Sequence, residues 1–123
     1  MAKPRILILD DEPLIAMMLQ DCLVDLGCEA VGPAYTVEAA LALLEGDVVD
    51  GAILDVKLAG ADSYPVALAL QRRSIPFVFA TGQGADGIDP RFKSAAILSK
   101  PFDFKAVQAA IAALTGPHQR AMD

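Results

Sequence analysis

Four apolar runs of strand length, each followed closely by a charged or hydroxyl side chain, constrain this chain most. The runs and the groups that follow them are residues 6–9 with Asp10, Asp11 and Glu12; residues 52–54 with Asp55; residues 77–80 with Thr81; and residues 95–98 with Ser99 and Lys100. Because the carboxyl ends of parallel strands meet at one edge of a sheet, a single parallel sheet would bring these groups together. We therefore expect three carboxylates, those of Asp10, Asp11 and Asp55, with a hydroxyl and an ammonium at one place.

The segments between these runs have helical periodicity. Apolar residues in 13–26 recur at i, i+3, i+4 and i+7, and the sequence predicts further helices over 37–46, 64–73 and after Asp103, with Thr36, Ser63 and Asp103 as N-caps. Strands are expected at residues 5–9, 29–32, 51–54, 76–80 and 95–98. Continuous apolar strands are typical of a parallel sheet with both faces covered. Right-handed crossovers then favour an α/β, flavodoxin-like, doubly wound sheet of five parallel strands in the order 2-1-3-4-5.

The stretch between Thr81 and Ala95 departs from this alternation, because a fourth helix is expected there. Gly82, Gly84, Gly87 and Pro90 leave little room for a regular helix. We expect a long connection over 82–94 with at most one or two turns after Pro90, so that the fourth helix is shortened or irregular.

Length and composition indicate one domain, residues 1–123, with a core of about 4–115 and a tail at 116–123. The net charge of −6 and the scattered basic residues argue against direct nucleic-acid binding. The apolar runs are too short to span a membrane and no signal peptide precedes the first strand, so we expect a cytoplasmic protein with a native start at Met1. Cys22 and Cys28 fit no zinc spacing or disulfide scaffold, and we expect reduced, half-buried thiols.

The acidic cluster predicts a metal site that handles phosphoryl groups. Clustered carboxylates repel, and a hard divalent cation such as Mg²⁺ removes the repulsion while recruiting phosphate oxygens. A carboxylate can also accept the phosphoryl group as a nucleophile. Lys100, the Thr81 hydroxyl and the backbone N–H of Gly82 would then neutralise charge on the phosphoryl oxygens. Each group alone has a plainer interpretation, such as helix capping by the acidic triplet or a solvated Asp55, but the four groups in this order favour a functional site.

These residues resemble the receiver domain of two-component response regulators. The resemblance covers essentially the whole chain and lies in residues 6–13, Asp55, residues 80–82 and Lys100-Pro101-Phe102. It implies that Asp55 is the phosphoacceptor and that Mg²⁺ (or Mn²⁺) is held by Asp11 and Asp55 directly, by Asp10 largely through water, and by the backbone carbonyl of Lys57. It also implies that Thr81, Lys100 and the Gly82 backbone contact the phosphoryl group, and that the peptide before Pro101 is cis.

The sequence departs from the common family pattern in the reporter of phosphorylation. The family usually has an aromatic residue three positions before the lysine, where this chain has Ile97. Residues 79–82, Phe-Ala-Thr-Gly, are similar to a subgroup of stand-alone receivers with an F-A-T-G signature and a degraded fourth helix, although Gly84 replaces the aromatic that often completes it.

The resemblance implies a phosphoryl-accepting switch rather than an enzyme. A histidine kinase or a histidine phosphotransfer protein would donate the phosphoryl group. The face formed by the family's fourth helix, fifth strand and fifth helix would bind a downstream protein or take part in phosphoryl relay. A weak homodimer is a further option that the sequence leaves open.

Two other functions use some of the same groups. An aspartyl-phosphate phosphatase shares the nucleophile, Mg²⁺, Thr and Lys, but usually has a second acid two residues after the nucleophile, where this chain has Lys57. A flavodoxin-like cofactor binder would need hydroxyl and backbone donors in the first strand-to-helix loop, where this chain has three acids that repel phosphate.

Overall fold

Five parallel strands form the central sheet of the structure, a computed structural model that describes residues 3–82, 88–92 and 94–115. Its elements are β1 (Arg5–Leu9), α1 (Pro13–Asp25), β2 (Glu29–Ala34), α2 (Val37–Gly46), β3 (Gly51–Asp55), β4 (Lys57–Leu58), β5 (Ala61–Asp62), α3 (Tyr64–Arg72), β6 (Phe77–Thr81), the 3-10 turn η2 (Pro90–Phe92), β7 (Ala96–Ser99) and α4 (Phe104–Thr115). The order β2-β1-β3-β6-β7 is the predicted order 2-1-3-4-5 once the strands of this sheet are counted along the chain. The predicted flavodoxin-like topology is therefore confirmed.

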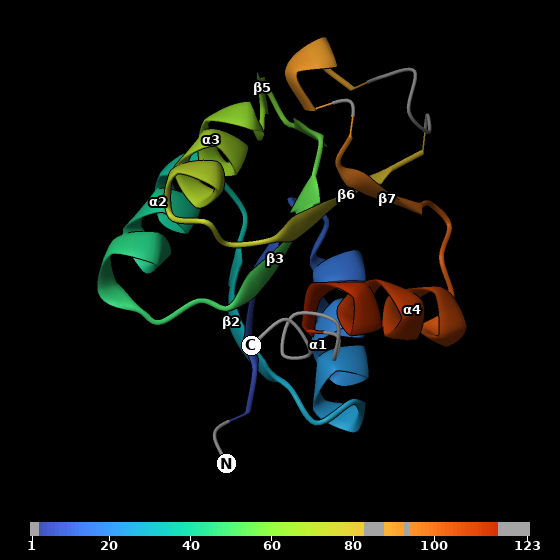
Figure 1. Cartoon of the computed structure of the whole chain (residues 1–123). Helices are drawn as coiled ribbons and strands as arrows, with labels where there is room; N and C mark the ends of the chain where they lie inside the picture. The colour runs from blue at the N-terminus through green and yellow to red at the C-terminus, as the bar shows by residue number, and fades with distance from the viewer. Residues whose placement is uncertain (1–2, 83–87, 93, 116–123) are drawn as a thin grey trace.

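Helices cover both faces of the sheet, which explains why the strands are continuous apolar runs. Figure 1 shows α2 and α3 on one side and α1 and α4 on the other. Alternate strand residues enter the two cores: Leu7, Leu54 and Phe79 pack toward the α2–α3 side, whereas Ile8 and Ile53 pack toward α1 and α4. Among the described residues, no helix has the length and apolar character needed to cross a membrane.

Two of the three predicted N-caps are confirmed and the third is wrong. The Thr36 hydroxyl accepts a hydrogen bond from the Ala39 N–H at 3.1 Å, and the Asp103 carboxylate accepts one from the Ala106 N–H at 2.9 Å. Before α3, the carboxylate of Asp62 takes the capping role and accepts from the Tyr64 N–H at 3.2 Å. Ser63 does not cap because its backbone (φ −91°, ψ 5°) turns its side chain into the interior, where its hydroxyl is fully buried.

The connection from Asp55 to α3, where no strand was predicted, contains a small antiparallel hairpin. Lys57 pairs with Asp62 and Leu58 pairs with Ala61, so that β4 and β5 enclose a two-residue turn. Gly60 makes this turn possible, because its φ of +75° lies in the left-handed region that favours glycine. Strands of two residues leave no periodic pattern in a sequence, and the prediction missed them for that reason.

The connection between β6 and β7 agrees with the prediction in the part that is described. A single 3-10 turn, η2, follows Pro90, and its Phe92 side chain is buried against the sheet. The remaining residues of the predicted irregular segment, 83–87 and 93, lie outside the described residues, as does the predicted tail at 116–123.

The β2 strand is two residues longer than predicted and contains an irregularity at Gly32. Gly32 has φ of +95°, and a Cβ atom there would lie 2.7 Å from the backbone nitrogen of Ala34. The peptide bonds before Pro33 and Pro101 are both cis, and the second was expected. Cys22 and Cys28 are free thiols and more buried than predicted, at 7% and 5% exposure.

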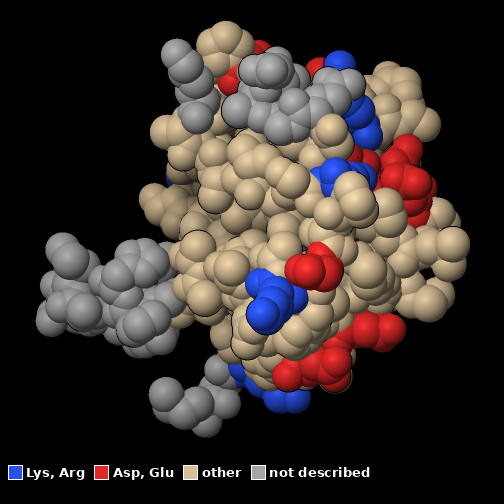
Figure 2. Space-filling model, turned by 90° about the vertical axis from the view of Figure 1, so that its right-hand side faces the viewer, with Lys and Arg blue, Asp and Glu red and all other residues tan. Residues whose placement is uncertain are grey.

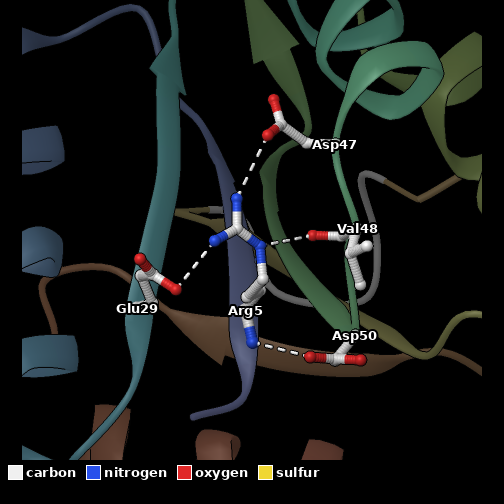
Figure 3. Close-up of polar contacts among 5 residues, drawn as sticks. All are labelled: Arg5, Glu29, Asp47, Val48 and Asp50. Carbon is white, nitrogen blue, oxygen red and sulfur yellow. Dashed lines mark hydrogen bonds and ion pairs between the residues drawn. The ribbon is translucent and has the colours of Figure 1, made fainter. Parts of the chain in front are cut away.

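Arg5 ties the amino ends of three strands together, at the end of the sheet opposite the acidic cluster (Figure 3). Its guanidinium donates to Glu29 of β2 at 2.7 Å, to Asp47 at 3.1 Å and to the carbonyl of Val48 at 2.8 Å. Its backbone N–H donates to the Asp50 carboxylate at 2.8 Å. One side chain thus holds β1, β2 and the connection from α2 to β3 in place.

Candidate functional site

Strand register brings the predicted site residues together at the carboxyl edge of the sheet. Leu9 is opposite Leu54, Asp55 is opposite Ala80, and Thr81 is opposite Ser99. Carboxylate oxygens of Asp10, Asp11 and Asp55 lie within 4.8 Å of one another. The sheet itself therefore positions these groups, since Asp55 ends β3 and Asp10 and Asp11 are the first two residues after β1.

Asp10 is the most buried member of the cluster, with 1% of its surface exposed. Its Oδ1 accepts a hydrogen bond from the Glu12 N–H at 2.9 Å, which begins the turn into α1. Its Oδ2 is buried without a hydrogen-bond donor among the described residues, and it faces the Lys100 ammonium at 3.3 Å. Burial raises the pKa of Asp10, although the Glu12 N–H and the charge of Lys100 oppose this shift.

Asp55 ends β3 with only 6% of its surface exposed. Burial, together with the nearby charge of Asp10, raises the pKa of Asp55 to about 6, although Lys100 opposes the rise. Its Oδ1 lies 3.3 Å from the Lys100 ammonium. Without a further cation, this carboxylate holds its proton more tightly than an ordinary aspartate does.

Lys100 contacts three of the acids at the carboxyl edge of the sheet, Asp10, Asp55 and Glu12. Its ammonium lies 3.3 Å from Asp10, 3.3 Å from Asp55 and 3.6 Å from Glu12. Burial opposes its positive charge, but the carboxylates of Asp10 and Asp55 prevail and raise the pKa of Lys100. Its backbone N–H donates to the Thr81 carbonyl at 2.9 Å, which fixes Lys100 beside β6.

Asp11 is held by a contact that the sequence did not reveal. Its Oδ2 accepts a hydrogen bond from the Ala59 N–H at 2.9 Å, in the turn of the β4–β5 hairpin. Lys57, whose carbonyl was expected as a metal ligand, lies on β4 of the same hairpin with its side chain exposed. Gly60 was the available signal, since glycine favours tight turns.

Thr81 and Gly82 occupy the expected side of the cluster. Thr81 is the last residue of β6 and is 6% exposed, and Gly82 follows it with an exposed backbone. The structure therefore gathers Asp10, Asp11, Asp55 and Lys100 in one cluster, and it places Thr81 at the end of the strand between those of Asp55 and Lys100.

The donor set suits a hard divalent cation. Asp10 presents a buried carboxylate oxygen that accepts no hydrogen bond within the described residues, and Asp55 has a pKa raised by burial and by a like charge. A cation coordinated by oxygen atoms would relieve both conditions, and Mg²⁺ prefers carboxylate and carbonyl oxygens. The residues present therefore fit the predicted magnesium site.

Charged side chains elsewhere on the surface are dispersed. Figure 2 shows small groups of basic and acidic atoms on one face, with uncharged surface between them. This distribution agrees with the net charge of −6 and with basic residues that are scattered along the sequence.

Known proteins resemble this chain over nearly its full length. The family model of the response regulator receiver domain matches residues 6–112. The solution structure of SdrG from Sphingomonas melonis is 51% identical and has a TM-score of 0.82, covering 94% of this chain and 99% of that one. The crystal structure of TrrA from Thermotoga maritima, solved in complex with Mg²⁺-BeF, is 26% identical with a TM-score of 0.79, covering 90% of this chain and 98% of that one.

A longer relative also matches. The transcriptional regulatory protein TcrA from Mycobacterium tuberculosis is 31% identical over 125 residues, which cover 94% of this chain and 48% of TcrA. The chain thus spans about half the length of this curated relative. Together with the sheet order and the acidic strand ends, these matches identify the fold as that of a signalling switch. The chain belongs to the response regulator receiver domain family of two-component signalling.

Proposed function

We propose that Asp55 accepts a phosphoryl group from a phosphohistidine in a Mg²⁺-dependent reaction. The observation that carries the proposal is the position of the Asp55 carboxylate, which ends β3 between Asp10 and the Lys100 ammonium. An Asp55 oxygen attacks phosphorus, the P–N bond to the histidine breaks, and the imidazole nitrogen regains its electron pair. The product is an acyl phosphate on Asp55.

The metal would be held by Asp10, Asp11, Asp55 and the backbone carbonyl of Lys57. A bound Mg²⁺ supplies positive charge that lets Asp55 stay ionised and that offsets charge on phosphoryl oxygens. The Ala59 N–H orients the Asp11 carboxylate from the opposite side, in the way that outer contacts usually fix metal ligands.

Lys100 and Thr81 act on the phosphoryl group from the other side of Asp55. The Lys100 ammonium, already 3.3 Å from Asp55, neutralises one phosphoryl oxygen. The Thr81 hydroxyl and the Gly82 N–H donate hydrogen bonds to the others. Because Thr81 begins the connection to β7, its new bond would pass the signal to that connection.

The phosphodonor is a histidine kinase or a histidine phosphotransfer protein, and an apolar surface beside the site fits such a partner. Leu14 and Met17 on α1 are 79% and 54% exposed. A hollow of about 330 Å³ next to them is lined by Ile15, Met18, Lys100, Pro101 and Phe102. Exposed apolar side chains around the entrance to a site favour protein docking over nucleic acid, which would need a basic face.

Output would pass through the face formed by residues 88–92, β7 and α4. A second hollow, of about 830 Å³, lies between β7 and α4 and has mostly apolar walls. Residues 1–123 would thus act as one receiver domain with its core at about 4–115. The two hollows share Pro101 and Phe102 in their walls, so the proposed input and output surfaces are neighbours.

Acetyl phosphate labelling tests this proposal directly. Wild type is expected to take up acid-stable, base-labile phosphate in Mg²⁺ and none in EDTA, and Asp55→Asn is expected to take up none. Asp21→Asn is the matched control, because Asp21 is an exposed acid on α1. Equal labelling of wild type and Asp55→Asn would refute the assignment, and sustained turnover of small phosphate esters would favour a phosphatase.

A further inference from the structure

Tyr64, the first residue of α3, joins three parts of the fold. Its ring stacks on Phe92 of η2, with centroids 5.3 Å apart and planes at 16°. It also meets Phe79 of β6 edge to face, at 5.9 Å and 87°. Its hydroxyl accepts a hydrogen bond from the Asp89 N–H at 2.8 Å. Tyr64 therefore holds the turn before β7 against α3 and the sheet.

The same residue is connected to both sides of the phosphorylation site. Val56, directly after Asp55, donates its N–H to the Ala80 carbonyl at 3.2 Å and accepts from the Ser63 N–H at 3.0 Å. Ser63 precedes Tyr64 in the chain. On the other side, Phe79 lies two residues before Thr81 and contacts both Tyr64 and Phe92, the second at 5.6 Å.

Asp89, whose N–H contacts Tyr64, also accepts two hydrogen bonds within the turn η2. Its carbonyl accepts from the Phe92 N–H at 2.8 Å, and its carboxylate accepts from the Arg91 N–H at 2.8 Å. The Asp89 N–H that reaches Tyr64 therefore belongs to the residue that organises η2. A change at this one hydrogen bond would alter the placement of the whole 3-10 turn.

We propose that Tyr64 is a positioning residue that couples occupancy of the Asp55 site to the placement of residues 89–92. The proposal rests on the proposed function, because it requires a phosphoryl group on Asp55 that accepts a hydrogen bond from Thr81. Thr81 ends β6, where the connection to β7 starts, and Tyr64 contacts Asp89 and Phe92 within that connection. A phosphoryl contact that fixes Thr81 lowers the conformational entropy still to be lost when the hydrogen bond between Tyr64 and Asp89 forms. That hydrogen bond therefore opens less often when the Asp55 site is occupied.

Amide exchange at Asp89 measures this coupling, with Mg²⁺ and beryllofluoride as the probe. In wild type, the probe should slow exchange of the Asp89 N–H by at least about fivefold, the lower end of typical couplings between sites. Tyr64→Phe keeps the ring and removes the hydroxyl, so its Asp89 amide should exchange faster and lose most of the response. Tyr35→Phe is the matched control, because Tyr35 is the other tyrosine and is 46% exposed.

Linkage supplies a second, independent measurement. If the probe strengthens the Tyr64 contact, the contact must strengthen probe binding by the same factor. Tyr64→Phe should therefore weaken beryllofluoride binding by about the factor lost in the exchange experiment, whereas Tyr35→Phe should not. Both affinities can be read from chemical shifts near Lys100.

The outcomes separate this inference from the proposed function. If the probe binds wild type and Asp89 exchange stays the same, Tyr64 does not couple and the phosphorylation site still stands. An equal response in wild type and Tyr64→Phe would overturn the inference in the same way. If the probe fails to bind wild type in Mg²⁺, the proposed function fails first.

Discussion

The Lys100 ammonium lies 3.3 Å from Oδ1 of Asp55 and 3.3 Å from Oδ2 of Asp10, so one cation faces two buried carboxylates. This ratio leaves the cluster short of positive charge. Burial, the main cause, raises the pKa of each carboxyl group, and the single ammonium only partly opposes this rise. The shortage is what suits the site to a second cation, and it makes the electrostatics of the site directly measurable.

Removing the Lys100 charge should raise the pKa of Asp55 further. Lys100 opposes the effects of burial and of Asp10, so Lys100→Met is expected to move the pKa from about 6 upward by about 1 unit. Carboxyl-carbon NMR titration in metal-free buffer measures the shift. Lys105→Met, at an exposed position on α4, should leave it unchanged. A lower pKa in Lys100→Met would contradict this account.

Stability of the metal-free protein should fall as pH rises from about 4 to about 6. The native pKa of Asp55 is above its ordinary 3.8, so the native state binds more protons than the unfolded chain in this window. Above this pH window, the charged Asp55 carboxylate lowers the free energy of unfolding by about 1–3 kcal/mol. Asp55→Asn should recover that amount at pH 7 and flatten the profile, as measured by urea unfolding in EDTA.

The control for this experiment is Asp21→Asn, which should follow the wild-type profile. Added Mg²⁺ should stabilise wild type at pH 7 and have much less effect on Asp55→Asn, because ligands that bind only the native state raise its stability. A loss of stability in metal-free Asp55→Asn at pH 7 would contradict this account, because it would mean that the native protein stabilises the charged Asp55 carboxylate.

The members of the acidic triplet should differ in their importance for metal binding. Asp11→Asn removes a proposed ligand and is expected to weaken Mg²⁺ binding at least about tenfold. Glu12 is 61% exposed at its side chain and lies 3.6 Å from Lys100, so Glu12→Gln should change the affinity by less than about twofold. Titrations followed by amide chemical shifts compare the two. Equal losses would place Glu12 among the ligands.

Two glycines offer a matched test of the backbone. A Cβ at Gly32 would lie 2.7 Å from the Ala34 nitrogen at a φ of +95°, so Gly32→Ala should destabilise the fold by about 1–3 kcal/mol. Gly46, at the end of α2, has open space around it and no positive φ. Gly46→Ala should be neutral or slightly stabilising in the same urea unfolding experiment. A neutral Gly32→Ala would show that β2 can shift to accept the methyl group.

Apolar runs and residues at strand ends were enough to predict the sheet and the grouping of Asp10, Asp11, Asp55 and Lys100 at its carboxyl edge, whose roles stay predictions. Residues 51–54 indicated a buried strand, and Asp55 after them indicated a site, because both signals are local. The contacts that the sequence did not reveal are long-range or depend on backbone geometry. Ala59 and Asp11 are 48 residues apart, and Tyr64 and Asp89 are 25 apart. Folding of the sheet brings such pairs together, and no periodic pattern in the sequence indicates them.

Ser63 shows how local reasoning fails at a helix start. A serine before Tyr64 suggested a cap, but the Ser63 hydroxyl makes no capping bond and the Val66 N–H donates to the Ser63 carbonyl instead. The Asp62 carboxylate accepts from the Tyr64 N–H. The hairpin over 57–62 fixes Asp62 in place, so a tertiary constraint decided between two good capping residues.

The Arg5 cluster has a consequence for how this fold can diverge. At the amino ends of the strands, the charges of Glu29, Asp47 and Asp50 are each matched by a donor from Arg5. At the carboxyl ends, two buried acids share one lysine. Only about five residues of β1 lie between these two poles. At the first, each carboxylate accepts a hydrogen bond from Arg5; at the second, a buried oxygen of Asp10 has no hydrogen-bond donor among the described residues. Mutations that retune signalling at one pole can therefore accumulate while the other continues to anchor the strands.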